Sequence, residues 1–240
     1  MNFELKDIDA MIFVATLPRS GSSMDCGALE CCGAFGGRTM GNVQANREGI
    51  FENRGLNTLL LNPILTEIDI HKASGLMTLQ RAGGPPAKLF NNWVRDLTFG
   101  MNHQGYNGGT AYFKNGLYTF LFDRINEVMP DATWILPTRS DDAVYDSHRR
   151  LHPNKKIEVI RKEIADYREM YNHILNTAKS AYVIDNDKVI AGDLSSMENA
   201  IKGIGGLEWD EKAVREWINP DMWGGKSKER IKRGGNNYRP

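Results

Sequence analysis

Short apolar runs alternate with longer amphipathic segments along most of the chain. The first run, residues 11–17, is continuously apolar apart from one Thr and contains Ile, Phe and Val. Such a run is typical of a strand covered on both faces of a parallel sheet. Three similar runs follow, so the predicted strands are residues 11–17, 110–114, 132–139 and 181–185.

Helical patterns fill the segments between these runs. A glycine pair closes the first predicted helix, and Ser140 or Asp141 is expected to cap the helix after the third strand. The predicted helices are residues 23–35, 57–70, 87–99, 117–129, 140–151, 157–179, 195–206 and 210–218. Strands alternating with helices predict an α/β fold of three layers, with a doubly wound, mainly parallel sheet that begins with a P-loop-like strand–loop–helix.

The length of 240 residues suits one domain, and we expect it to span residues 1–225. Residues 226–240 contain six basic side chains and one acidic one among glycines and asparagines. This composition predicts a basic, flexible C-terminal tail.

Composition limits the classes of partner. Thirty basic residues balance thirty acidic ones, which argues against a nucleic-acid partner. No apolar run is long enough for a membrane span and the first residues lack a secretory pattern, so we expect a cytoplasmic protein without a transmembrane segment. The cysteines fit neither a zinc site nor a disulfide framework and are expected to be small buried residues in a reducing compartment; they are Cys26, Cys31 and Cys32.

The first strand ends in "PRSGSS", residues 18–23. Backbone N–H groups at a helix N-terminus favour an anion, Gly21 allows close approach, and Arg19 can donate two hydrogen bonds to a phosphoryl group. The loop lacks the first Gly and the Lys of a Walker A motif. It therefore indicates a phosphate site of another kind, with an ordinary serine-rich helix cap as the alternative.

A second polar pair follows the third predicted strand. Arg139 ends that strand and Ser147 comes eight residues later, two turns along a helix. Ligands of open α/β sheets bind at the carboxyl ends of the strands. The pair can thus hold a second phosphate, or it can be a surface Arg and an unrelated helical Ser.

Together the two motifs resemble the sulfotransferases that use 3′-phosphoadenylyl sulfate, and the bacterial or carbohydrate-type members in particular. The resemblance extends over residues 11–215. It implies 3′-phosphoadenylyl sulfate as co-substrate, adenosine 3′,5′-bisphosphate as the leaving nucleotide, and no metal. It assigns Arg139 and Ser147 to the 3′-phosphate, and to the 5′-phosphosulfate it assigns Arg19, Ser20, Gly21, Ser22 and Ser23.

Other stretches add to the resemblance. "GIFEN", residues 49–53, is similar to the family's G-[FYW]-[FYW]-E-[ND] segment, and "YFKNG" to the strand whose Lys reaches the sulfuryl group, here Lys114. Cytosolic members follow that Lys with Thr and a catalytic His, whereas this chain has Asn115 and Gly116. Residues 232–235, "KRGG", resemble the family's C-terminal R-K-G segment in part.

The general base must then come from elsewhere. Glu52 is the first candidate by resemblance to carbohydrate-type members, and Glu48 is the second. A carboxylate needs a raised pKa to act as a base near neutral pH. Alternatively, Glu52 caps a helix or pairs with Arg47 or Arg54. Histidines on polar segments are expected at the surface, as His71, His103, His148 and His152.

The predicted reaction moves a sulfuryl group to a hydroxyl or amine of a small-molecule or glycan acceptor. Arg19 and Lys114 would neutralise the developing charge and Glu52 would take the proton. Four aromatic residues can stack on an acceptor or can fill a core under a long insertion, the second interpretation being favoured for Trp93; they are Trp93, Phe99, Tyr106 and Tyr112. The alternatives are a P-loop kinase of a small metabolite and a non-catalytic nucleotide-binding module.

Overall fold

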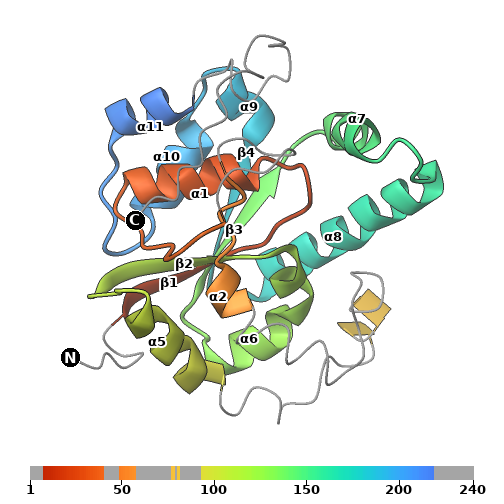
Figure 1. Cartoon of the computed structure of the whole chain (residues 1–240). Helices are drawn as coiled ribbons and strands as arrows, with labels where there is room; N and C mark the ends of the chain where they lie inside the picture. The colour runs from red at the N-terminus through yellow and green to blue at the C-terminus, as the bar shows by residue number, and fades with distance from the viewer. Residues whose placement is uncertain (1–7, 41–48, 58–76, 79, 82–92, 219–240) are drawn as a thin grey trace.

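The computed structural model of the chain describes residues 8–40, 49–57, 77–78, 80–81 and 93–218. Within these residues a four-stranded, all-parallel sheet has the order β2-β1-β3-β4, with helices on both faces (Figure 1). The strands are β1 Ile8–Val14, β2 Gly109–Lys114, β3 Thr133–Thr138 and β4 Ser180–Asp185. The predicted doubly wound α/β fold is confirmed.

The helices divide into two layers. One layer contains α1, α9, α10 and α11, and the other contains α5, η4, α6 and α8, while α7 lies at the edge of the molecule (Figure 1). Their bounds are α1 Ser22–Cys31, α2 Arg54–Leu56, α5 Trp93–His103, η4 Gly116–Leu121, α6 Phe122–Val128, α7 Asp141–Leu151, α8 Ile157–Thr177, α9 Asn186–Ile190, α10 Ser195–Lys202 and α11 Glu211–Trp217.

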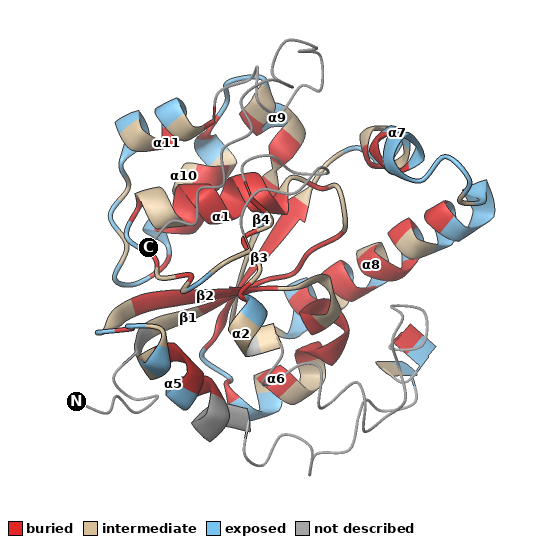
Figure 2. Cartoon of the chain, viewed as in Figure 1, coloured by how far each residue is buried: buried red, intermediate tan, exposed pale blue. Residues whose placement is uncertain are grey.

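Each strand contributes to two cores because successive side chains point to opposite faces of the sheet. In β1, Phe13 joins the core under α5, α6 and α8, whereas Ile12 and Val14 join the core under α1, α10 and α11. In β3, Trp134 and Ile135 divide in the same way. Figure 2 shows the result, with α1 and the middle of the sheet almost wholly buried.

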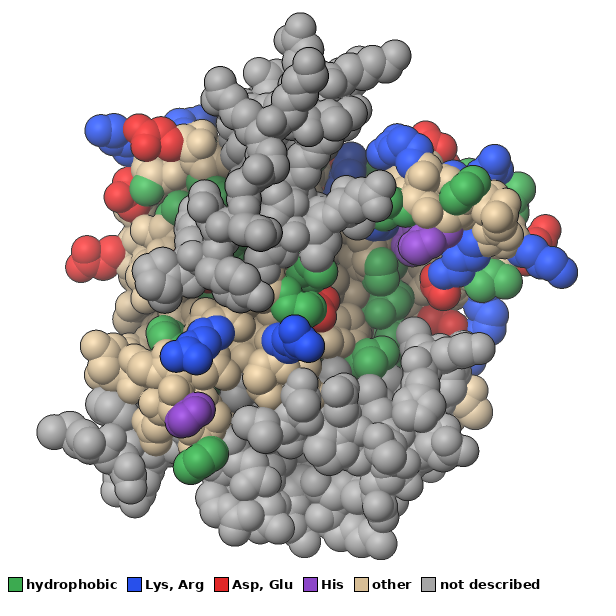
Figure 3. Space-filling view, viewed as in Figure 1, with side chains coloured by type: hydrophobic (Ala, Val, Ile, Leu, Met, Phe, Trp, Pro, Cys, Tyr) green, Lys and Arg blue, Asp and Glu red, His purple; other side chains and the backbone are tan. Residues whose placement is uncertain are grey.

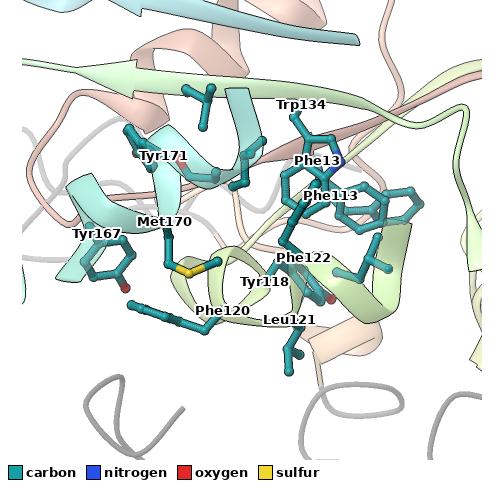
Figure 4. Packing of buried hydrophobic residues seen from close by; sticks show 14 of the residues in the cluster. Phe13, Phe113, Tyr118, Phe120, Leu121, Phe122, Trp134, Tyr167, Met170 and Tyr171 are labelled. Carbon is teal, nitrogen blue, oxygen red and sulfur yellow. Dashed lines mark hydrogen bonds between the residues drawn. The ribbon is translucent and has the colours of Figure 1, made fainter. Parts of the chain in front are cut away.

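Aromatic rings fill the core between the sheet and α8 (Figure 4). Phe13 stacks on Trp134 and Phe122 meets Trp134 edge-on, both with ring centroids 5.0 Å apart. Such pairs contribute about 0.5–1.5 kcal/mol each beyond the burial of their surface. Helix α8 supplies a buried stripe at helical spacing: Ile160, Ile164, Tyr167, Met170, Tyr171 and Ile174.

Some elements differ from the sequence prediction. Strand β1 ends at Val14, three residues before the predicted end, because the chain turns there into the loop that leads to α1. The predicted helix 117–129 is divided into η4 and α6 because the side chain of Asn115 accepts the Leu117 N–H and starts a tight 3-10 turn. Helix α9 was not predicted.

Ser140 occupies the capping position of α7, but its hydroxyl makes no capping hydrogen bond. Most of the predicted helix 57–70, the start of the predicted helix 87–99, and the tail at 226–240 lie outside the described residues. In the part of the chain that is described, no helix combines the length and apolar character needed to cross a membrane.

One buried hydroxyl fixes the loop after β1. Tyr171 Oη accepts the Leu17 N–H at 2.8 Å and lies 2.6 Å from the carbonyl oxygen of Ala15, to which it donates. The carbonyl oxygen of Pro137, in β3, is 3.1 Å from the same hydroxyl. Tyr171 therefore joins β1 to β3 at their carboxyl ends, where open α/β sheets form their ligand sites.

Changing Tyr171 to Phe should destabilise the fold by about 1–3 kcal/mol, because the Leu17 N–H would be buried without its partner. Urea unfolding measures this loss. The matched control is Tyr182→Phe, whose hydroxyl donates to the Gly203 carbonyl at 3.2 Å in an exposed position, so its cost should stay within about 0.5 kcal/mol. Equal costs for the two variants would contradict the anchoring role of Tyr171.

Candidate functional site

The loop between β1 and α1 turns through left-handed backbone conformations. Arg19 has φ 73° and Gly21 has φ 98°. A side chain at Gly21 is excluded on steric grounds too, because a Cβ there would lie 2.6 Å from Asn186 Nδ2. A positive φ at a residue other than Gly is strained and persists only where neighbouring contacts enforce it. The loop therefore presents Arg19 in one enforced orientation.

Asn186 holds this loop from α9 on the opposite side from Tyr171. It is fully buried, and its Nδ2 donates to the Ser20 carbonyl at 2.8 Å and to Asp25 Oδ2 at 3.0 Å. Sequence reasoning missed Asn186 because a polar residue after a strand has no distinctive pattern. Asn186 therefore ties the loop to the first turn of α1.

Asp25 lies beneath the loop in the first turn of α1 and is only 1% exposed. Burial raises the pKa of Asp25 to about 8, against the hydrogen bond from Asn186 and the charge of Lys114, which lower it. Asp25 was not predicted as a site residue, although an acid in the first helical turn is a recognisable feature. The site thus contains a carboxyl group that binds a proton at neutral pH.

The structure brings the two predicted phosphate motifs into direct contact. Arg19 Nε donates to Ser147 Oγ at 2.8 Å, which joins the loop after β1 to helix α7. The sequence had assigned these residues to opposite ends of the nucleotide. Their contact brings the two motifs together at the carboxyl edge of the sheet.

The positive charges of Arg150 and Arg139 act on Arg19 where the loop after β1 meets α7. Burial lowers the pKa of Arg19, and the charges of Arg150 and Arg139 lower it further. Arg150 lies three residues after Ser147, one turn along α7, and was missed although this spacing puts it on the same helix face. Figure 3 shows basic side chains over α7 and the start of α8, interspersed with acidic and hydrophobic ones. Like charges this close favour an anionic ligand.

Arg139 follows the end of β3, as predicted, and is held by α9. Its Nε donates to Asp187 Oδ1 at 3.0 Å, while its carbonyl accepts from Arg168 Nη2 at 2.5 Å. A guanidinium has four further N–H donors on its two Nη atoms. The ion pair with Asp187 can therefore orient Arg139 while other donors bind an anion.

Lys114 ends β2 and is only 4% exposed. Its Nζ donates to Ser23 Oγ at 2.8 Å and to the carbonyl of Ile50. Burial lowers the pKa of Lys114, and nearby Cys26, Glu52 and Asp25 oppose that effect. The contact with Ser23 puts Lys114 beside the first turn of α1, close to the predicted 5′-phosphate residues.

Glu52 lies on a segment that is also strained. The preceding residue, Phe51, has φ 59° and packs edge-on against Trp217 with ring centroids 5.5 Å apart. Burial raises the pKa of Glu52, partly offset by the charge of Lys114. Its Oε2 accepts hydrogen bonds from two amides, Asn115 and Asn57, so pairing with Arg54 is not formed.

Several residues suggested for an acceptor cleft or a base lie elsewhere. Tyr112 is buried and donates to Glu30 at 2.7 Å, and Tyr106 is buried and donates to the Gly109 carbonyl at 2.6 Å, so both fill cores instead. His148 is buried rather than at the surface, and burial lowers its pKa. Glu48 and His71 lie outside the described residues.

The described residues contain no group of three or more His, Cys, Asp and Glu side chains that could hold a metal ion.

Comparison with known proteins gives structural but no sequence relatives. No protein-family model matches the chain, and no curated protein is similar to it in sequence. The sulfotransferase STF1 from Mycobacterium tuberculosis H37Rv superimposes with a TM-score of 0.60 at 15% identity, over 90% of this chain and 74% of that one. The sulfotransferase domain of the Synechococcus PCC 7002 olefin synthase gives 0.56 at 17% identity, over 95% and 91%.

The chain has the sulfotransferase fold. At these identities the likeness concerns the fold alone, and it confirms the sulfotransferase fold that the sequence motifs suggested. The loop after β1, Lys114 at the end of β2 and Arg139 after β3 therefore occupy one edge of a sulfotransferase-type sheet.

The buried carboxyl of Asp25 predicts a specific pH dependence. The pKa is about 4 in an unfolded chain and about 8 in the fold, so between these values the folded state binds the extra proton. Stability from this group is therefore lost as pH rises from about 4 to about 8. Asp25→Asn should remove that loss and become more stable relative to wild type over the same range.

Urea unfolding at about pH 5 and about pH 8 measures the free energy of unfolding of wild type and of Asp25→Asn. Asp146→Asn, at an exposed position on α7, controls for the change in net charge. A wild-type-to-Asp25→Asn difference that stays constant with pH would contradict a protonated Asp25.

Proposed function

We propose that this protein is a sulfotransferase that moves a sulfuryl group from 3′-phosphoadenylyl sulfate to a hydroxyl or amine of a small-molecule or glycan acceptor. The observation that supports this best is the hydrogen bond between Arg19 and Ser147. It joins the two motifs proposed to bind the phosphates, within a fold shared with two sulfotransferases.

The donor nucleotide would use the whole carboxyl edge of the sheet. The 5′-phosphosulfate binds the loop and the N-terminus of α1, where unpaired N–H groups and the helix dipole favour an anion. The 3′-phosphate binds at Arg139 and Ser147, with Arg150 adding positive charge. The residues proposed for the 5′ end are Arg19, Ser20, Gly21, Ser22 and Ser23.

The transfer itself would be an in-line displacement at sulfur. The acceptor oxygen or nitrogen forms a bond to sulfur as the bond from sulfur to the 5′-phosphate oxygen breaks, and adenosine 3′,5′-bisphosphate leaves. Arg19 and Lys114 stabilise the charge that develops on the leaving oxygen. Glu52 takes the acceptor proton, and the raised pKa of Glu52 brings this carboxylate closer to the range of an effective base.

Nucleotide selectivity tests the donor site. Adenosine 3′,5′-bisphosphate should bind far more tightly than 5′-AMP in calorimetric titrations without magnesium. Arg139→Ala should erase the difference, because loss of a charge-assisted phosphate contact costs on the order of 2–5 kcal/mol. Arg149→Ala is the matched control on the exposed face of α7, where Arg149 contacts the Tyr145 hydroxyl at 3.3 Å.

Equal affinity for the two nucleotides, or equal losses in Arg139→Ala and Arg149→Ala, would refute the proposed 3′-phosphate site. Tight binding that appears only with a magnesium–nucleoside triphosphate would instead favour the kinase that the sequence left open.

The base assignment is tested separately from binding. Glu52→Gln should lower sulfuryl transfer from labelled 3′-phosphoadenylyl sulfate to a panel of hydroxyl and amine acceptors by about 100- to 10,000-fold, the usual contribution of a general base. Binding of the bisphosphate should be unchanged. Glu211→Gln, at an exposed position on α11, should behave as wild type. Wild-type transfer by Glu52→Gln would exclude Glu52 as the base.

A further inference from the structure

The residue after Lys114 has a side chain with a defined orientation. Asn115 is extended, with φ −165° and ψ 138°, and its Oδ1 accepts the N–H of Leu117 at 2.9 Å at the start of η4. Because the oxygen of the amide is used in this bond, the NH2 group must point the other way. It lies 3.2 Å from Glu52 Oε2.

Asn57 repeats this arrangement from the segment that follows Glu52. Its Oδ1 accepts from the Tyr118 hydroxyl at 3.4 Å, and its Nδ2 donates to the same Glu52 Oε2 at 3.4 Å. Two amides, each with its oxygen already bonded to η4, therefore direct N–H groups at one carboxylate oxygen. Among the described residues, the other oxygen, Oε1, has no hydrogen-bond partner.

A side chain at the next residue, Gly116, would be crowded by its neighbours. A Cβ at this position would lie 2.8 Å from the Tyr167 hydroxyl and 3.1 Å from the carbonyl oxygen of Thr16. A Cβ contact below 3.0 Å requires the neighbouring atoms to move. The space in which a side chain would extend is thus partly filled by Tyr167 from α8, and the carboxylate that Asn115 contacts is Glu52.

The charged surroundings of Glu52 come from four elements. Lys114 from β2 is the cation that acts on it, while Cys26 from α1, Tyr118 from η4 and Tyr167 from α8 also interact with its charge. Burial raises the pKa of each of these three groups, so they are neutral at physiological pH. Neutral N–H donors favour the ionised carboxylate without competing for its proton.

We propose that Asn115 is a positioning residue for the reaction, which holds Glu52 through Oε2 in one rotamer and leaves Oε1 for the acceptor's proton. The proposal rests on the proposed function. It assigns to Asn115 two separable tasks, since its oxygen starts η4 and its amide nitrogen orients the base.

The two tasks are separated by Asn115→Asp. An aspartate keeps the oxygen that accepts the Leu117 N–H, but it replaces the donor to Glu52 with a second carboxylate. The apparent pKa on the acidic limb of the transfer rate should rise by about one unit or more, because a like charge opposes ionisation of Glu52. Transfer at neutral pH should fall at least tenfold, with nucleotide affinity unchanged.

Asn199→Asp adds the same charge on α10, on the opposite face of the sheet, and should leave the pH profile unchanged. Asn57→Asp should shift the profile in the same direction as Asn115→Asp. An Asn115→Asp profile that superimposes on that of wild type, while Glu52→Gln abolishes transfer, would overturn the positioning role and leave the proposed function intact.

The effect of Asn115 on the pKa of Glu52 is also measurable without turnover. NMR titration of the Glu52 carboxyl in protein labelled with 13C-glutamate, assigned by the signal lost in Glu52→Gln, gives its pKa directly. We expect a higher pKa in Asn115→Asp than in wild type. If no acceptor of the panel is sulfated, the proposed function fails on its own, whereas identical Glu52 titrations in both proteins overturn the role of Asn115.

Discussion

A backbone turn buried between two helical layers is the constraint on which the site depends. Strand β1 has neighbours on both sides and cores on both faces, so the buried peptide groups of Ala15, Leu17 and Ser20 need hydrogen-bond partners from the protein. Tyr171 from α8 and Asn186 from α9 supply them from opposite sides. The same two residues therefore hold the loop on both sides of Arg19.

The site concentrates unfavourable features that the rest of the fold offsets. Arg19 and Phe51 both have positive φ values, Asp25 is a carboxyl without exposed surface, and three arginines repel one another. Each would cost free energy in isolation. Their grouping at one sheet edge, above two well-packed cores, is typical of sites where stability is given up for binding and chemistry.

Periodicity and short motifs in the sequence were enough to predict the framework of the site. Apolar runs indicate the four strands and their parallel arrangement. The loop, Lys114 and Arg139 each come at the end of a predicted strand, and this position indicates that they lie at one edge of the sheet. Asn186 and the Asn115 contact with Glu52 could not be predicted, because each joins elements distant in sequence. Arg150 was missed although it lies one helical turn from Ser147 on α7. The two interpretations of Tyr112, an acceptor cleft or a core, could not be separated because an aromatic residue in a strand gives the same pattern in both.

The Arg19–Ser147 contact has a consequence for the energetics of ligand binding. One side chain is shared between the two ends of the proposed nucleotide site, so those ends cannot act as independent subsites. A ligand group that draws Arg19 toward the loop changes the hydrogen bonds that Ser147 can make on α7, and so changes the free energy of binding at Ser147. By thermodynamic reciprocity, a group bound at Ser147 changes the free energy of binding at Arg19 by the same amount. Affinities of fragments that occupy one end would therefore not add up to the affinity of the whole nucleotide.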